Sequence, residues 1–211
     1  MNDLIVIKLG GSLIQQAAGQ GLHRLGSIIR QHSRRQPLAI LPGGGPFADT
    51  VRHYGQELKL TEETCHPMAL LGMDQFGHVL RQFIPGSRLV EVAGPETRHS
   101  IVTAEPAILL CSRYINRVPE WQIPRSWEAT SDTIAAYLAQ LLQAAMLIMI
   151  KSVDVDPKIQ TPDVDPCFQQ SLAPDLPVWF LNGRHPDRLA ELMTTGRTQG
   201  VYLPARQLPQ R

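Results

Sequence analysis

The sequence is poor in cysteine, in net charge and in long apolar runs, and each shortage excludes a class of protein. Three cysteines in 211 residues, far apart and without a Cys-x-x-Cys pair, fit neither a disulfide framework nor a zinc ribbon. A formal net charge of +1 gives no electrostatic reason to expect binding to nucleic acid or to an anionic membrane. The apolar stretch at 144–150 is far shorter than the ~20 residues that span a bilayer. We therefore expect a cytoplasmic protein with reduced thiols, no nucleic-acid partner and no membrane partner.

The motifs of the common nucleotide-binding and metal-dependent enzymes are also missing. No Gly-x-x-x-x-Gly-Lys-[Ser/Thr] P-loop, Gly-x-Gly-x-x-Gly dinucleotide loop or protein-kinase signature occurs. The seven histidines lack metal-ligand spacing, so we predict surface or packing roles for them, His66 and His78 included, and no metal site. Any phosphate-binding site must therefore be built from other parts.

What the sequence does contain is a regular alternation of strands and helices. Strands are expected at 4–9, 38–41, 88–92, 107–110, 146–150, 178–181 and 200–203. Thr61 and Ser131 are expected to cap helices, and residues 114–127 and 154–177 to be irregular. The alternation predicts a single domain with an α/β fold, a three-layer α/β/α sandwich around a largely parallel central sheet.

Two glycine clusters follow two of the expected strands, where α/β sheets bind their ligands. The first is Lys8-Leu9-Gly10-Gly11-Ser12, whose amide and ammonium groups suit phosphate oxygens. The second, Gly43-Gly44-Gly45, precedes a helix whose N-terminal amide groups suit an anion. Each cluster alone could be an ordinary turn, with Lys8 reaching solvent. Together they predict two facing cradles for two phosphate groups.

Polar residues open the helix that is expected after position 130. Asp132 either complements the positive end of the helix dipole or acts as a buried carboxylate that orients lysines or helps to hold a metal–nucleotide complex. Thr130 and Ser131 either cap this helix or donate hydrogen bonds to a substrate. The sequence leaves both pairs of alternatives open.

A second lysine ends the strand expected at 146–150. Lys151 would lie on the same sheet edge as Lys8, and Asp154 and Asp156 follow it. The alternatives are a solvated strand end with Asp-Pro turns, or a set of groups that binds a nucleotide.

These four segments, in this order, resemble the amino acid kinase family, which includes acetylglutamate, aspartate, uridylate and isopentenyl phosphate kinases. The Lys-x-Gly-Gly-Ser signature starts at Lys8, and the Gly-Gly-Gly loop starts at Gly43. The helix-opening aspartate matches Asp132, and a Lys-x-x-x-Val-Asp segment starts at Lys151. With a closing Gly-x-x-x-Gly pattern from Gly196, the resemblance spans nearly the whole chain.

The resemblance implies an ATP- and Mg²⁺-dependent kinase that phosphorylates a small molecule. Lys8, Asp132 and Lys151 would be catalytic, with Asp132 fixing the lysines in place. The residues that would bind ATP are Lys8, Gly10, Gly11, Ser12, Lys151, Asp154 and Asp156. The residues that would bind the acceptor are Gly43, Gly44, Gly45, Trp127, Thr130 and Ser131. The resemblance also implies an acceptor-binding part at about 1–130 and a nucleotide-binding part at about 131–211. It further implies a homodimer or higher homo-oligomer, paired through the long helix that carries Met68 and Leu71.

The sequence departs from the family pattern late in the chain. Many members carry a Gly-Gly-Met-x-x-Lys segment whose lysine supports catalysis, but residues 166–176 contain no lysine. Lys151 or Lys158 would have to supply that charge, or the activity is weak or altered. Asp156-Pro157 also replaces the usual Asp-Gly.

The acceptor is suggested by the segment 43–49 together with Trp127-x-x-Thr-Ser-Asp. Both are similar to those of the short members near the aminomethylfuran-methyl phosphate kinases of methanofuran biosynthesis, which turn a phosphomonoester into a diphosphate. Trp127 would then flank the furan ring or, alternatively, pack in the core. A carboxylate acceptor would use the same glycines. A non-catalytic nucleotide-binding protein and a subunit that acts only in a heteromeric complex are the alternatives from other classes.

Overall fold

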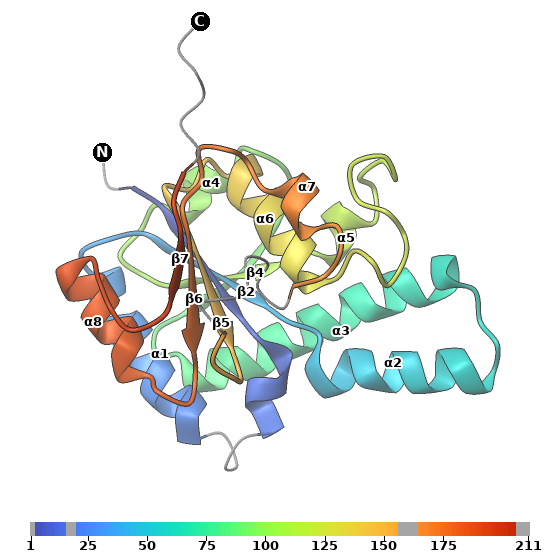
Figure 1. Cartoon of the computed structure of the whole chain (residues 1–211), viewed down its shortest axis with the longest axis horizontal. Helices are drawn as coiled ribbons and strands as arrows, with labels where there is room; N and C mark the ends of the chain where they lie inside the picture. Colours follow the sequence, from blue (N-terminus) through green and yellow to red (C-terminus); the bar gives the residue numbers. More distant parts are fainter. Residues whose placement is uncertain (1–2, 16–19, 156–163, 206–211) are drawn as a thin grey trace, which may run out of the picture.

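The computed structural model describes residues 3–15, 20–155 and 164–205, and a single sheet joins all of their strands (Figure 1). The strands are β1 (Ile5–Leu9), β2 (Leu38–Pro42), β3 (Arg88–Glu91), β4 (Ala107–Leu110), β5 (Met146–Lys151), β6 (Val178–Asn182) and β7 (Val201–Leu203). Their order is β3-β4-β2-β1-β5-β6-β7, and only the β6–β7 pair is antiparallel. The predicted largely parallel α/β sandwich is confirmed.

Helices cover both faces of this sheet, which explains why every residue of β1 is buried and all but Lys8 are apolar. The helices are η1 (Gly11–Gln15), α1 (Gln20–Ser33), α2 (Gly45–Glu57), α3 (Glu62–Phe83), α4 (Thr97–Ile101), α5 (Ser112–Ile115), α6 (Ser131–Leu141), α7 (Phe168–Ser171) and α8 (Asp187–Thr195). One core lies between the sheet and α6, where Val6 packs, and the other lies under α1, α3 and α8, where Ile5 and Ile7 pack. Successive residues of β1 therefore face opposite layers.

The pair α2 and α3 forms a long helical hairpin that extends past the edge of the sheet (Figure 1). Thr61 caps α3 as predicted, because its side chain accepts a hydrogen bond from the amide of Thr64. Met73 of this helix is buried, whereas Met68 and Leu71 on its outer side are 37% and 55% exposed. Those two residues are therefore not part of the core.

The expected boundaries hold, with small corrections. The predicted cap at Ser131 is wrong by one residue: Thr130 is the N-cap of α6, and Ser131 is its first helical residue. Short helices that lack a clear apolar period were not predicted, namely η1, α4, α5 and α7. No helix in the described ranges has the length and apolar character that a membrane crossing requires.

Candidate active site

The alternation of side chains along two adjacent strands brings two lysines to one face of the sheet. In β1, Lys8 has the same parity as Val6 and points toward the α6 layer. In β5, Lys151 has the parity of Met149, which pairs with Lys8 in the parallel register. Both lysines therefore reach the space beneath the N-terminus of α6, at the carboxyl end of the sheet.

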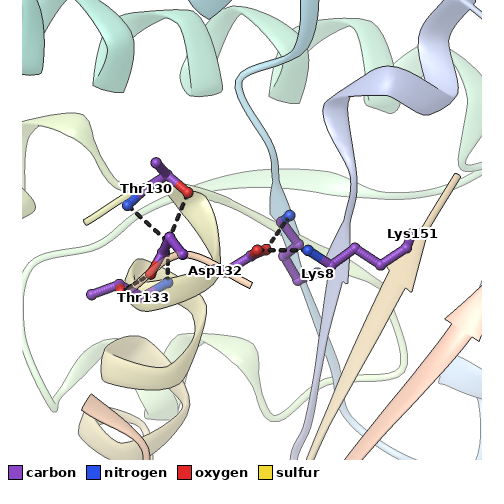
Figure 2. A network of polar contacts seen from close by, with 6 residues as sticks. Lys8, Thr130, Asp132, Thr133 and Lys151 are labelled. Atoms are coloured by element: carbon purple, nitrogen blue, oxygen red, sulfur yellow. Dashed lines mark hydrogen bonds and ion pairs between the residues drawn. The ribbon is translucent and has the colours of Figure 1, made fainter. Parts of the chain in front are cut away.

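Both ammonium groups form ion pairs with Asp132, which lies in the first turn of α6 (Figure 2). Lys8 Nζ lies 2.6 Å from Asp132 Oδ1, and Lys151 Nζ lies 2.6 Å from Oδ2. Lys8 is only 4% exposed, so the alternative of a solvent-reaching lysine is wrong. Burial by itself would raise the pKa of the Asp132 carboxyl, but the two lysines outweigh burial and hold that pKa below its usual value.

The two glycine turns are packed directly against each other, because β1 and β2 are neighbours and end at the same level. A Cβ on Gly11 would lie 2.0 Å from Gly45 N, and a Cβ on Gly43 would lie 2.6 Å from Gly11 N. Gly45 also has φ +53°, a conformation that favours glycine. Glycine is thus required sterically here, and the expectation that the two turns meet is correct.

Not every amide group in these turns is directed at a ligand. Gly10 donates its N–H to the carbonyl of Ile150 at 2.8 Å, and Gly43 donates to the carbonyl of Leu9 at 2.8 Å. The predicted cradles at 10–12 and 43–45 therefore each use one amide group to join strands. Gly44, the N-cap of α2, and Gly45, its first residue, stand where a helix offers amide groups without an internal acceptor.

A pocket opens beside this centre, between α2, α3 and the start of α6, and we call it the α2–α6 pocket. Its wall contains the predicted acceptor-binding residues Gly44, Gly45, Trp127, Thr130 and Ser131. Ser131 is next in sequence to Asp132, so the pocket adjoins the lysine–aspartate cluster. Gly43, the remaining predicted contact, is buried behind this wall.

Sequence reasoning did not anticipate several polar residues that line the same pocket. The guanidinium carbon of Arg52 lies 4.2 Å from the ring centroid of Trp127, a cation–π contact. His66, predicted as a packing or surface residue, also lines the pocket and is 7% exposed. Burial, supported by the charge of Arg125, lowers the pKa of His66, although Glu120 opposes the shift. The imidazole of His66 is therefore neutral near pH 7 and forms part of the pocket wall.

A second carboxylate, which was not predicted from the sequence, holds the start of α6. Asp165 Oδ2 accepts hydrogen bonds from Thr130 N at 2.8 Å, Thr130 Oγ1 at 2.7 Å and Thr133 N at 3.0 Å. Asp165 Oδ1 accepts from Thr133 Oγ1. The proton of the Thr130 hydroxyl is therefore directed at Asp165 and not into the pocket, where a substrate contact was expected.

The expected nucleotide side, beyond β5 and β6, is more open. The carboxylate of Asp154, predicted to bind ATP, forms an ion pair with Arg188. Hydrogen bonds from Arg188 and Asn182 hold the pKa of Asp154 below its usual value. Asp156 and Lys158 lie outside the described residues. In the described residues 164–176 no side chain takes the place of the family's late lysine, whereas Lys151 does reach the Asp132 carboxylate.

The donors at this site suit phosphate oxygens, and a metal would be held mainly through the nucleotide. Two ammonium groups and a helix N-terminus are typical ligands of phosphate groups. Among the described residues no three His, Cys, Asp or Glu side chains form a cluster that could cage an ion. Mg²⁺ commonly binds through substrate phosphates, water and one or two carboxylates, which such a site can accommodate.

Comparison with known proteins assigns the family. The model of the amino acid kinase family matches residues 3–162, which is most of the chain. The chain belongs to the amino acid kinase family. It is therefore a phosphotransferase enzyme, and the family implies ATP as the phosphoryl donor.

Two curated relatives of this amino acid kinase carry different names. The [5-(aminomethyl)furan-3-yl]methyl phosphate kinase of Methanocaldococcus jannaschii is 26% identical in an alignment 209 positions long that covers 89% of this chain and 92% of the relative. The uridylate kinase of Methanothrix thermoacetophila is 24% identical over 151 residues, which cover 72% of this chain and 63% of that protein.

Solved structures of UMP kinases share the fold of this amino acid kinase. The Bacillus anthracis enzyme superposes with a TM-score of 0.73 at 16% identity and covers 96% of both chains. The uridylate kinase of Archaeoglobus fulgidus has a TM-score of 0.68 at 15% identity and covers 94% of this chain and 98% of its own. These similarities confirm the sheet and its helical layers.

Proposed function

We propose that this chain transfers the γ-phosphoryl group of ATP to the phosphate of a small phosphomonoester. The proposed acceptor is [5-(aminomethyl)furan-3-yl]methyl phosphate or a close analogue, as used in the synthesis of a methanofuran-type cofactor. The observation that carries the proposal is the convergence of Lys8 and Lys151 on Asp132 next to the α2–α6 pocket. The relative that covers nearly the whole chain and carries that substrate in its name supports it.

The cluster suits phosphoryl transfer because this reaction depends on positioning and on neutralising spread negative charge. The bond between the γ-phosphorus and the oxygen that bridges to the β-phosphate breaks, and a bond from an acceptor phosphate oxygen forms. The products are ADP and a diphosphate. A phosphomonoester oxygen carries no proton that must be removed near pH 7, so the mechanism needs no strong general base.

Each member of the cluster has a proposed role in this step. Lys8 contacts the phosphoryl group during transfer, and Lys151 contacts the nucleotide phosphates and supplies the charge that the late family lysine provides elsewhere. Asp132 holds both ammonium groups in place through its two oxygens. Gly10, Gly11 and Ser12 would shape the wall that the ATP phosphates approach. Mg²⁺, when bound with ATP, would neutralise further phosphate charge.

The two halves of the chain would divide the substrates. The acceptor would bind to the part at about 1–130, with its phosphate near Gly44 and Gly45 at the N-terminus of α2 and its ring near Trp127. Arg52 lies above that indole and forms an ion pair with Asp49, which also lines the pocket. ATP would bind to the part at about 131–211, on the side of Asp154.

The proposal is tested by mixing the purified protein with ATP·Mg²⁺ and single acceptors. The panel contains [5-(aminomethyl)furan-3-yl]methyl phosphate, its dephosphorylated alcohol, UMP and N-acetylglutamate. We expect ADP formation with the furan phosphate, and coupled diphosphate signals in the phosphorus NMR spectrum. Turnover with the alcohol, or with no member of the panel, would contradict the proposed acceptor class.

The same panel decides between the proposal and its alternatives. A carboxylate-phosphorylating kinase would form an acyl phosphate, which hydroxylamine traps as a hydroxamate, whereas a diphosphate does not react. A non-catalytic nucleotide-binding protein would bind ATP in a calorimeter without transfer to any acceptor. The absence of a late lysine from residues 164–176 favours that second alternative.

We also propose a homodimer that pairs through α3. The exposed Met68 and Leu71 on the outer side of this helix support this assembly. Light scattering after size-exclusion chromatography should give twice the mass of one chain, and the Leu71→Glu variant should give the mass of a monomer.

A further inference from the structure

The N-termini of two helices border the α2–α6 pocket, and they differ in what they offer a ligand. Gly44 and Gly45 at the start of α2 line the pocket, and so do Thr130 and Ser131 at the start of α6. The first amide groups of a helix have no acceptor within the helix, and the helix dipole favours an anion there. At the N-terminus of α6, the carboxylate of Asp165 already occupies the position of such an anion.

The Asp165 carboxylate replaces an ordinary helix cap. Thr130, the N-cap residue of α6, makes no capping bond with its own side chain. Instead, Asp165 accepts the amide hydrogens of Thr130 and Thr133 and the hydroxyl hydrogens of the same two threonines. Four hydrogen bonds from one helical turn to one carboxylate are the ligand set expected for a bound anion.

The two threonines that Asp165 holds flank Asp132, the residue that pairs with both lysines. Asp132 lies between Thr130 and Thr133 in sequence, and Figure 2 shows it pointing away from them toward Lys8 and Lys151. Its two oxygens each lie 2.6 Å from an ammonium nitrogen, a geometry that a small rotation of the helical turn would break. Whatever fixes that turn therefore fixes the lysine positions.

We propose that Asp165 is an internal anion at the N-terminus of α6, which positions Asp132 for Lys8 and Lys151. Asp165 is a positioning residue, because its contacts are to Thr130 and Thr133 and not to the lysines. The inference deepens the proposed function and rests on it for its effect on turnover. The anion site that removal of the Asp165 carboxylate should open can be measured without ATP or an acceptor.

The chain offers a matched control in Asp74. Its carboxylate accepts hydrogen bonds from Cys111 N at 2.9 Å, Ser112 N at 3.4 Å and the Ser112 hydroxyl. It thus holds the start of a different helix, α5, which carries neither the lysines nor Asp132. Asp74→Asn measures the general cost of losing such a carboxylate.

The first measurement is thermal unfolding of Asp165→Ala with and without sodium formate, with sodium chloride at equal ionic strength as the reference. We expect a melting temperature roughly 5–10 °C below that of the wild type. Formate should restore several degrees of this loss and leave the wild type unchanged, because only the variant has an open anion site. If formate stabilises both proteins equally, or neither, Asp165 is not an internal anion.

The second measurement is turnover of Asp165→Asn, which also serves if Asp165→Ala does not fold. We expect kcat to fall about 10- to 100-fold with KM for ATP within twofold, since a misplaced group at the reacting centre costs this much. Asp74→Asn should keep kcat within twofold of the wild type. A kcat of Asp165→Asn within twofold of the wild type, or an equal loss in Asp74→Asn, would overturn the positioning role. If the wild type turns over no acceptor, the proposed function fails, and the formate experiment still decides the inference.

Discussion

The turns that follow β1 and β2 are more tightly packed and more deeply buried than the turns that follow β5 and β6. On the first side, the backbone of Gly11 touches that of Gly45, and Lys8 is buried against Asp132. On the second side, Asp154 is mainly exposed and pairs with Arg188. The proposed acceptor side and reacting centre are thus tightly packed, whereas on the proposed nucleotide side the described Asp154 is a surface group.

The tighter packing after β1 and β2 makes that region more sensitive to substitution. Backbone contacts under 3 Å leave no room for a new atom, and a buried charge without its partner is strongly unfavourable. An exposed ion pair, in contrast, contributes about 0–1 kcal/mol. Substitutions on the β1–β2 side should therefore have much larger effects than those beyond β5 and β6.

The largest effect is expected for Gly11→Ala, because Gly11 lies where the two glycine turns are packed most closely. The new Cβ would lie 2.0 Å from Gly45 N and 2.3 Å from Gly45 Cα, and backbone atoms cannot yield as a side chain does. We expect the free energy of unfolding to fall by about 4 kcal/mol or more. Urea unfolding measures it, with Gly21→Ala as the control because its Cβ would lie 3.7 Å from the nearest atom. Equal stability of the two variants would show that the turns are not packed as described.

The next effect is expected for Lys8→Met, which keeps much of the side chain and removes its charge. Loss of this ammonium group should lower kcat about 10³-fold, the size seen when a group that stabilises transition-state charge is deleted. Steady-state kinetics at saturating ATP and acceptor measures this change. Lys59→Met, on the turn after α2, should retain kcat within twofold. A modest, equal loss in both variants would contradict a role for Lys8 in the reacting centre.

A third effect concerns acid stability and the carboxylate of Asp132. Its pKa in the folded protein is lowered from 3.8, so the ion pairs stabilise the fold fully above that pH. This contribution is lost as the pH falls through the lowered folded value. Asp132→Asn leaves two ammonium groups without this partner and should cost about 3–5 kcal/mol at pH 6. Melting curves from pH 2 to 6 should show less acid dependence in the variant than in the wild type; parallel curves would refute the ion-pair account.

A smaller effect is expected for Trp127→Ala in the α2–α6 pocket. Removal of the indole and of its contact with Arg52 should raise KM for the acceptor about 10-fold, or ~1.4 kcal/mol, and change KM for ATP less than twofold. Trp121→Ala is the control, because Trp121 is 81% exposed and does not line this pocket. If KM for ATP rose instead, the pocket would belong to the nucleotide.

The smallest effect is expected for Asp154→Asn, on the open side. Because its pair with Arg188 is exposed on the carboxylate side, we expect KM for ATP to change about twofold or less. Asp187→Asn removes a comparable exposed pair with Arg24 and serves as the reference. A tenfold rise of KM for ATP in Asp154→Asn alone would show that this surface group is a strong nucleotide ligand. It would contradict the expectation that substitutions beyond β5 and β6 have small effects.

The sequence contained the parts of the site whose signal is local. The apolar runs gave the strands, and strand parity with the end of each run places Lys8 and Lys151 on one side of the sheet. The glycine clusters were recognisable because a plain turn does not need so many glycines. The roles of these residues in catalysis remain proposals.

The missed features depend on contacts that are distant in sequence. Asp165 acts on Thr130 from 35 residues away, and its Asp-Val-Asp-Pro context is typical of a turn. Leu71 belongs to the apolar residues of α3 and is 55% exposed, whereas its neighbour Leu70 is buried, because the two side chains leave the helix in different directions. Periodicity indicates which residues share a face and does not show what covers that face.

The central claim is that Lys8, held by Asp132, faces the phosphoryl group that is transferred. A crystal structure with ADP, aluminium fluoride and the furan phosphate tests it most directly, because the fluoride complex stands in for the phosphoryl group in flight. We predict that Lys8 Nζ lies within hydrogen-bond distance of the fluoride group, with the acceptor phosphate beside Gly44 and Gly45. A complex in which the fluoride group binds elsewhere, and Lys8 contacts Asp132 alone, would contradict it.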